Sequence, residues 1–144
     1  MLVVLVVLFS QFVTSAGAAP TALPASPVTF AILHTNDFHG QLEPSGSNPG
    51  SARIATYVNT VRTGLGAGNV LLVDAGDKMQ GSLLSNMTQG EATIATYNAM
   101  DYKVATFGNH EFDWGQTVLS DRTVQANFPY VTAKIVVNDT GNCA

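Results

Sequence analysis

The sequence predicts an α/β layered fold, because short runs of strand-forming residues alternate with stretches of helical periodicity. Four runs rich in apolar, β-branched and aromatic residues are predicted strands: 28–35, 70–73, 103–107 and 130–137. The segments between them contain three predicted helices: 52–61, which we expect Gly64 to end, 91–100 and 115–127. The run 70–73 is apolar without interruption, which is typical of a strand buried on both faces.

The N-terminal segment differs in character from the rest of the chain. Residues 2–9 are an unbroken apolar run, and Ala16-Gly17-Ala18 supplies the small residues of a cleavage site. We interpret 1–19 as a secretory signal peptide, although no Lys or Arg precedes the apolar run; a buried N-terminal strand or an anchoring helix is the alternative. Cleavage would leave 20–27 as a flexible mature N-terminus and 28–144 as the folding unit of a secreted protein.

Composition limits the kinds of partner. The chain has 144 residues, a formal net charge of −4, 46% hydrophobic residues and 11% charged residues, which suits one modest domain with a core. Its 6 Lys and Arg residues offer no basic patch for a nucleic-acid polymer. An anionic small-molecule substrate would therefore need a bound cation to attract it. Apart from the predicted signal peptide, we expect no transmembrane segment.

Secretion makes three further features relevant. Asn86-Met87-Thr88 and Asn138-Asp139-Thr140 are N-glycosylation sequons. Cys143 is the single cysteine, and an unpaired cysteine in an oxidising compartment suggests a partner outside this chain. We take Cys143 as a first indication that the chain is a fragment.

Polar side chains that suit a metal ion follow three of the predicted strands. Asp37 and His39 come after the first strand at positions i and i+2, so an extended segment presents both on one side. Asp77 follows the second strand, and Asn109 with His110 follows the third. In α/β folds, catalytic and binding residues lie in the loops beyond the carboxyl ends of the strands. We therefore expect the three clusters to lie together and form one site. Carboxylate, imidazole and amide ligands without a thiolate suit Zn, Mn, Fe or Co ions. Taken singly, an Asx turn at Asp37 and a helix cap at Asp77 remain alternatives.

The segment 107–115 is the most polar of these loops. Asn109 and His110 are neighbours, so their side chains point in roughly opposite directions, and one can face an ion while the other faces what the ion binds. Asp113 follows His110 by three residues, and in a helix this spacing places its carboxylate beside the imidazole. The alternative is a capped helix start, with Asn109 or Asp113 as the N-cap and Glu111 in the first turn.

Three motifs of the chain resemble those of a known family. The motifs are Thr35-Asn36-Asp37-Phe38-His39-Gly40, Gly76-Asp77-Lys78-Met79-Gln80-Gly81-Ser82 and Gly108-Asn109-His110-Glu111-Phe112-Asp113. In order and spacing they resemble the first three metallophosphoesterase blocks of the 5′-nucleotidase family, which includes bacterial UDP-sugar hydrolases. The resemblance runs from about Thr29 to Ala133. It implies a β-sandwich flanked by helices, which in this chain would be incomplete at the C-terminus.

The resemblance also implies a site with two divalent metal ions. Four residues would hold the ions: Asp37 and His39 the first, Asp77 both, and Asn109 the second. His110 and Asp113 would form the catalytic dyad that meets the phosphoryl group. The ions would make the site positive toward a phosphate dianion and lower the pKa of bound water from about 15.7 to about 7, so that it attacks phosphorus in line.

The function that follows is an N-terminal portion of a secreted phosphoester hydrolase, a 5′-nucleotidase that releases phosphate from nucleotides in nucleotide catabolism. In the family, later histidines complete the site and a C-terminal domain grips the nucleoside. No histidine follows His110 here and the sequence ends at Ala144, so we expect weak metal binding and little turnover by this chain alone. The alternative is a short secreted module that binds metal or nucleotide without catalysis.

Overall fold

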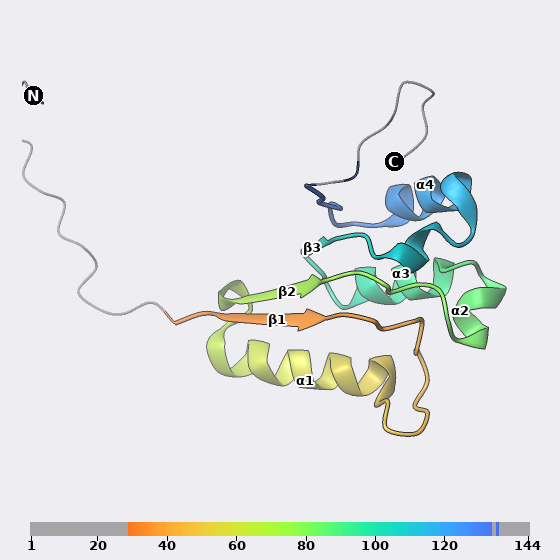
Figure 1. Cartoon of the computed structure of the whole chain (residues 1–144). Coiled ribbons are helices and arrows are strands. Elements are labelled where there is room, and N and C mark those ends of the chain that lie inside the picture. The colour runs from red at the N-terminus through yellow and green to blue at the C-terminus, as the bar shows by residue number, and fades with distance from the viewer. Residues whose placement is uncertain (1–28, 134, 136–144) are drawn as a thin grey trace, which may run out of the picture.

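A computed structural model of the chain describes residues 29–133 and 135, and shows one parallel sheet with helices packed against it (Figure 1). The sheet has the order β1-β2-β3, with β1 at Ala31–Thr35, β2 at Val70–Asp74 and β3 at Val104–Ala105. The helical elements are α1 (Gly50–Leu65), η1 (Ala67–Asn69), α2 (Leu83–Met87), α3 (Glu91–Ala99), η2 (Asn109–Phe112) and α4 (Gly115–Gln125). The predicted signal peptide, the segment 20–27, Asn138 and Cys143 lie outside the described residues.

The predicted alternation of strands and helices is confirmed, with differences at element ends. Helix α1 runs through Gly64 and ends before Gly66, whose φ of 86° suits a residue without a side chain. An interior glycine costs a helix only about 1 kcal/mol, so Gly64 alone does not end it. The third strand is shorter than predicted, and the described part of the fourth, residues 130–133 and 135, shows one bridge from Tyr130 to Ala105. Helices η1 and α2 were not predicted, and η2 lies where the sequence analysis kept a helix start as the alternative.

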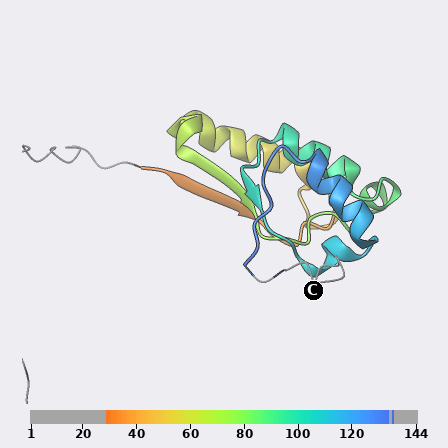
Figure 2. The ribbon, with the colours of Figure 1, turned by 90° about the horizontal axis from the view of Figure 1, so that it is seen from above.

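The two faces of the sheet differ in their cover. Helices α1 and α3 lie on one face, as the view from above shows (Figure 2). The apolar cluster on this face includes Phe38, Val58, Leu72, Met79, Ile94, Tyr97, Met100, Tyr102, Ala105, Leu119 and Phe128. Its burial supplies the main stabilisation of the fold.

On the other face, Ile32 pairs in register with Leu71, and both side chains are exposed. The prediction that 70–73 is buried on both faces is therefore not met within the described residues, where Leu71 is 40% exposed. The second sheet of the expected sandwich is likewise not among them. Within the described residues, no helix is both long and apolar enough to cross a membrane.

The parallel register places the carboxyl ends of all three strands at one edge of the sheet. The backbone amide of Ala75 donates to the carbonyl of Thr35 (2.8 Å), and that of Thr106 donates to Asp74 (3.0 Å). The segments that leave the strands are thus held next to one another before their loops begin. This edge carries the polar motifs.

Candidate active site

The loops after β1 and β2 run side by side beyond the sheet. Backbone amides of the first loop donate to carbonyls of the second in three successive bonds: Asp37 to Gly76 (3.1 Å), His39 to Asp77 (2.9 Å) and Gly40 to Lys78 (2.8 Å). This pairing continues the parallel arrangement of the strands. It places the first two polar motifs in direct contact.

The loop after β3 joins them through Asp77. The backbone amide of His110 donates to Asp77 Oδ1 at 2.8 Å. Gly76 and Gly108 let the two loops approach, because a Cβ on Gly108 would lie 2.1 Å from Asp77 Oδ1 and one on Gly76 would lie 2.6 Å from the Gly108 nitrogen. The three loops therefore meet at one edge, as the sequence predicted.

Three side chains of this edge form a cluster that could hold a metal ion. One ligand atom from each of His39, Asp77 and His110 lies within 4.8 Å of the others, and all three residues are half-buried. The two imidazole rings meet nearly edge to face, with centroids 5.1 Å apart. Imidazole and carboxylate are donors that suit divalent zinc, manganese, iron or cobalt.

The tautomer of His39 is fixed by a hydrogen bond to a backbone carbonyl. Its Nδ1 lies 2.8 Å from the carbonyl oxygen of Gln80. Because a carbonyl only accepts hydrogen bonds, Nδ1 carries the proton in the neutral ring and Nε2 keeps a free lone pair. A histidine held in this way is ready to bind a cation through Nε2.

Residues at and just before helix α2 also support the His39 loop. The amide of Ser82 donates to the His39 carbonyl (2.8 Å), and the Asn86 side chain exchanges two hydrogen bonds with the backbone of Gly81 (2.9 and 3.1 Å). A Cβ on Gly81 would lie 2.6 Å from the His39 carbonyl oxygen. Asn86, the first residue of one sequon, is therefore used to fix this loop.

The other two predicted metal ligands lie at the rim. Asp37 and Asn109 are exposed, and Asp37 is not part of the three-residue cluster. Asp37 Oδ2 accepts a hydrogen bond from Asn36 Nδ2 at 2.7 Å. The backbone contacts above nevertheless join the loops of Asp37 and Asn109 to Asp77.

The backbone is strained at the predicted ligands. Asp37, His39 and Asp77 have φ values of 50°, 50° and 54°, in the left-handed region that residues with a side chain seldom adopt. Such a conformation costs on the order of 1–3 kcal/mol and persists where the surroundings enforce it. The hydrogen bonds between the loops provide that enforcement.

His110 and Asp113 form the predicted pair. Nδ1 of His110 lies 2.7 Å from Asp113 Oδ2, and both side chains are partly exposed. The hydrogen bond that His110 Nδ1 donates to Asp113, aided by the negative charges of Asp113, Asp77 and Glu111, raises the pKa of His110 above 6.5, against a smaller opposing effect of desolvation. The 3₁₀ turn of η2 brings the two side chains together, because it places residues three apart on one side.

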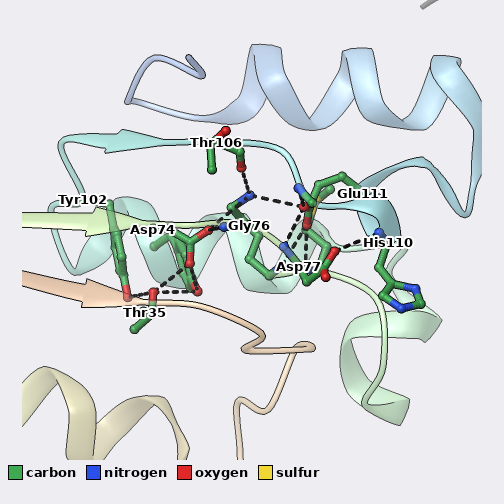
Figure 3. A network of polar contacts seen from close by, with 12 residues as sticks. Thr35, Asp74, Gly76, Asp77, Tyr102, Thr106, His110 and Glu111 are labelled. Carbon is green, nitrogen blue, oxygen red and sulfur yellow. Dashed lines mark hydrogen bonds and ion pairs between the residues drawn. The ribbon is translucent and has the colours of Figure 1, made fainter. Parts of the chain in front are cut away.

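A buried charged network behind the loops was missed by the sequence analysis (Figure 3). Lys78 and Glu111 are 0% and 1% exposed. Lys78 Nζ lies 3.3 Å from Asp74 Oδ1 and 3.6 Å from Glu111 Oε2, and it donates to the Thr106 carbonyl at 2.8 Å. Burial raises the pKa of Asp74, and the Lys78 charge and several hydrogen bonds oppose that rise. The available signal was the opposite charge of Lys78 and Glu111 in two loops predicted to share one sheet edge.

Comparison with known proteins gives a consistent result. The sequence model described as Calcineurin-like phosphoesterase matches residues 30–143, which include all three motifs. The 5′-nucleotidase of Bos taurus is 37% identical over 123 residues, and the match covers 77% of this chain and 21% of the bovine protein. The snake venom 5′-nucleotidase of Gloydius brevicauda is 34% identical over 128 residues, covering 81% of this chain and 21% of the venom protein.

A solved structure shows the same fold. The 5′-nucleotidase precursor of Thermus thermophilus has a TM-score of 0.65 and 35% sequence identity, over 74% of this chain and 22% of that one. This chain therefore spans about a fifth of the length of these relatives. The match of the family model over most of the sequence shows that the chain belongs to the calcineurin-like phosphoesterase family.

Proposed function

We propose that this chain carries the metal-binding loops of a secreted 5′-nucleotidase, a hydrolase that releases phosphate from nucleotides. The cluster of His39, Asp77 and His110 at the carboxyl edge of the sheet carries the proposal. The relatives named as 5′-nucleotidases support the choice of nucleotides as the substrate class. The chain covers about a fifth of these relatives, so we further propose that it is the N-terminal portion of the enzyme.

We propose that this edge of the sheet holds two divalent metal ions. His39 offers a free Nε2, and Asp77 has one carboxylate oxygen that accepts no hydrogen bond from His110. Asp37 and Asn109, at the rim of the same edge, complete the predicted ligand set. When bound, such ions supply positive charge for the phosphoryl oxygens and a water of lowered pKa.

His110 and Asp113 are proposed to act on the phosphoryl group. The bond from Nδ1 to Asp113 orients the ring and favours its charged form, in which Nε2 also carries a proton. That proton can be donated to a phosphoryl oxygen or to the leaving group. The position of His110 within the cluster also allows a second role, as a metal ligand. The two roles predict different results when His110 is removed.

The charge at this edge makes catalysis depend on a cation. Asp37, Asp77 and Asp113 are carboxylates, while the buried Lys78 already balances one of its two acidic partners. Without bound metal, the edge repels a phosphate dianion. Metal ions therefore serve substrate binding as well as chemistry.

The proposal is tested by metal removal from the complete protein that carries this sequence. Chelation should abolish phosphate release from a nucleoside 5′-monophosphate, and added Mn²⁺ should restore it. Asp77→Asn should remain inactive at the same Mn²⁺ concentration, whereas Asp121→Asn, an exposed change on α4, should respond like the wild type. Activity that survives chelation would refute the proposal.

The alternative of a short non-catalytic module is decided by the same assay. We expect the 144-residue chain alone to bind Mn²⁺ weakly and to release little or no phosphate, because it has no histidine after His110. If the complete protein also binds Mn²⁺ but hydrolyses no phosphoester, the module is the better description. Secretion predicts a mature N-terminus at Pro20, which N-terminal sequencing of the exported protein would check.

A further inference from the structure

Glu111 is a common acceptor for the backbones of two loops. Its carboxylate accepts four N–H groups: Asp77 (2.8 Å) and Gly108 (2.6 Å) at Oε2, and Lys78 (2.8 Å) and Met79 (3.3 Å) at Oε1. The bond to Gly108 is local: Gly108 is the N-cap of η2, whereas the capped helix start considered from the sequence had Asn109 or Asp113 in that place. The other three span 32 to 34 residues of sequence. Glu111 thus ties the loop after β2 to the loop after β3.

Lys78 makes this burial of a carboxylate tolerable. Its ammonium group lies between the carboxylates of Glu111 and Asp74, donates to the Thr106 carbonyl, and sits 4.8 Å from the centroid of the Tyr130 ring. A buried carboxylate without such a partner is strongly disfavoured. These interactions join the ammonium group to β2 itself and to parts of the chain that follow β3.

These contacts constrain both the backbone and the side chain of Asp77. This residue has a left-handed backbone, its N–H is held by Glu111, and its Oδ1 is held by the His110 amide. At Gly76 and Gly108 the two loops approach so closely that neither position has space for a Cβ. The direction of the Asp77 carboxylate and the position of the His110 ring therefore depend on the same buried group.

We propose that Glu111 is a positioning residue of the site, which together with Lys78 holds Asp77 and His110 facing one point before any metal or substrate binds. This inference rests on the proposed function, in which Asp77 is a metal ligand. Glu111 does not touch substrate in this role and acts only through the two loops. Preorganisation of this kind matters because residues that orient metal ligands typically contribute about 10- to 100-fold to metal affinity.

Glu111→Gln tests the proposal with almost no change in size. Whichever way the amide is turned, its NH₂ group replaces an acceptor oxygen, so two of the four N–H groups lose their partner. Glu111→Asp is the second variant, since it keeps the charge but withdraws the carboxylate by one methylene. Asn98→Ala is the matched control, because it removes two hydrogen bonds that join α3 to the end of α4, away from these loops.

Two measurements on the complete protein separate positioning from general stability. In the metal-free state, hydrogen exchange should speed up by about 10-fold or more at Asp77, Lys78 and Gly108, beyond any change at the core residues Leu72 and Ile94. The dissociation constant for Mn²⁺ should rise by about 10- to 100-fold in Glu111→Gln and less in Glu111→Asp. In Asn98→Ala it should stay within about 3-fold of the wild type at equal folded fraction.

The outcomes that overturn the inference are distinct. Wild-type exchange at the loop amides, or an equal increase at Leu72 and Ile94, would give Glu111 only a structural role. The same conclusion follows if neither Glu111 variant folds. If the wild-type protein binds no Mn²⁺, the proposed function fails, while the exchange measurement still decides whether Glu111 holds the loops.

Discussion

In the loops after β2 and β3, neighbouring residues have opposite environments. Lys78 and Glu111 are fully buried, whereas Asp77 and His110, one position earlier in each loop, are half-buried and face the site. Successive side chains of a turning backbone point in different directions, so one loop can supply an anchor and a reactive group side by side. In our proposals, the buried, inward members, Lys78 and Glu111, fix the geometry, and the half-buried, outward members, Asp77 and His110, carry the chemistry.

Removal of the buried Lys78 ammonium group should have the largest effect on the free energy of unfolding. In Lys78→Met, the carboxylates of Asp74 and Glu111 remain buried without a positive partner, which should lower the free energy of unfolding by about 3–5 kcal/mol. Urea unfolding measures the loss. Lys103→Met is the control, because the pair of Lys103 with Asp101 is exposed and should change stability by at most about 1 kcal/mol. Equal losses in the two variants would remove the distinction between inward and surface charges.

Removal of the outward imidazole should affect rate rather than fold. In the complete protein, His110→Ala should reduce phosphate release by about 10²–10⁴-fold while the Mn²⁺ content stays at the wild-type value. Asp77→Asn is the comparison, because it should lose metal and activity together. If His110→Ala loses Mn²⁺ to the same extent, His110 is a metal ligand and the proposed acid role is wrong.

The outward pair also predicts a pH effect. In Asp113→Asn the pKa of His110 should fall, because the hydrogen bond that its ring donates to the Asp113 carboxylate is the main cause of its rise. In the wild type, a folded-state pKa above the value of 6.5 stabilises the fold fully below about pH 6.5, and this contribution is lost as the pH rises through the folded-state pKa. NMR titration of the His110 ring in the metal-free protein measures the change. Asp121→Asn should leave the titration in place, and a His110 pKa that is the same in Asp113→Asn would contradict the pairing.

The smallest effect is expected at Tyr130, whose ring faces Lys78 on the inward side. Its buried hydroxyl has no hydrogen-bond partner among the described residues, so Tyr130→Phe should change the free energy of unfolding by less than about 1 kcal/mol. The ring keeps its place over the ammonium group and its stacking on Phe107. Tyr130→Ala, which removes the ring, should cost about 3–5 kcal/mol in the same urea measurement. A large loss in Tyr130→Phe would reveal a partner for the hydroxyl.

Much of the site could be predicted before folding is considered. Ligand chemistry is a property of residue type, and the position of Asp77 or His110 a few residues after an apolar run is visible in the sequence. The spacing of His110 and Asp113 likewise predicted their contact, which the structure shows at 2.7 Å. The roles of Asp37, His39, Asp77 and Asn109 as metal ligands, and of His110 and Asp113 in catalysis, stay predictions.

The sequence by itself determined the alternation of strands and helices, the three polar motifs and the edge of the sheet where they gather, because periodicity and residue type are local. Only the tertiary structure decided that Glu111 reaches the Asp77 loop, that Lys78 is buried, and that Leu71 is exposed within the described residues. Burial and charge pairing depend on which distant segments pack together. A glutamate that caps a helix and a buried glutamate that joins two loops therefore look the same in the sequence, and only the fold distinguishes them.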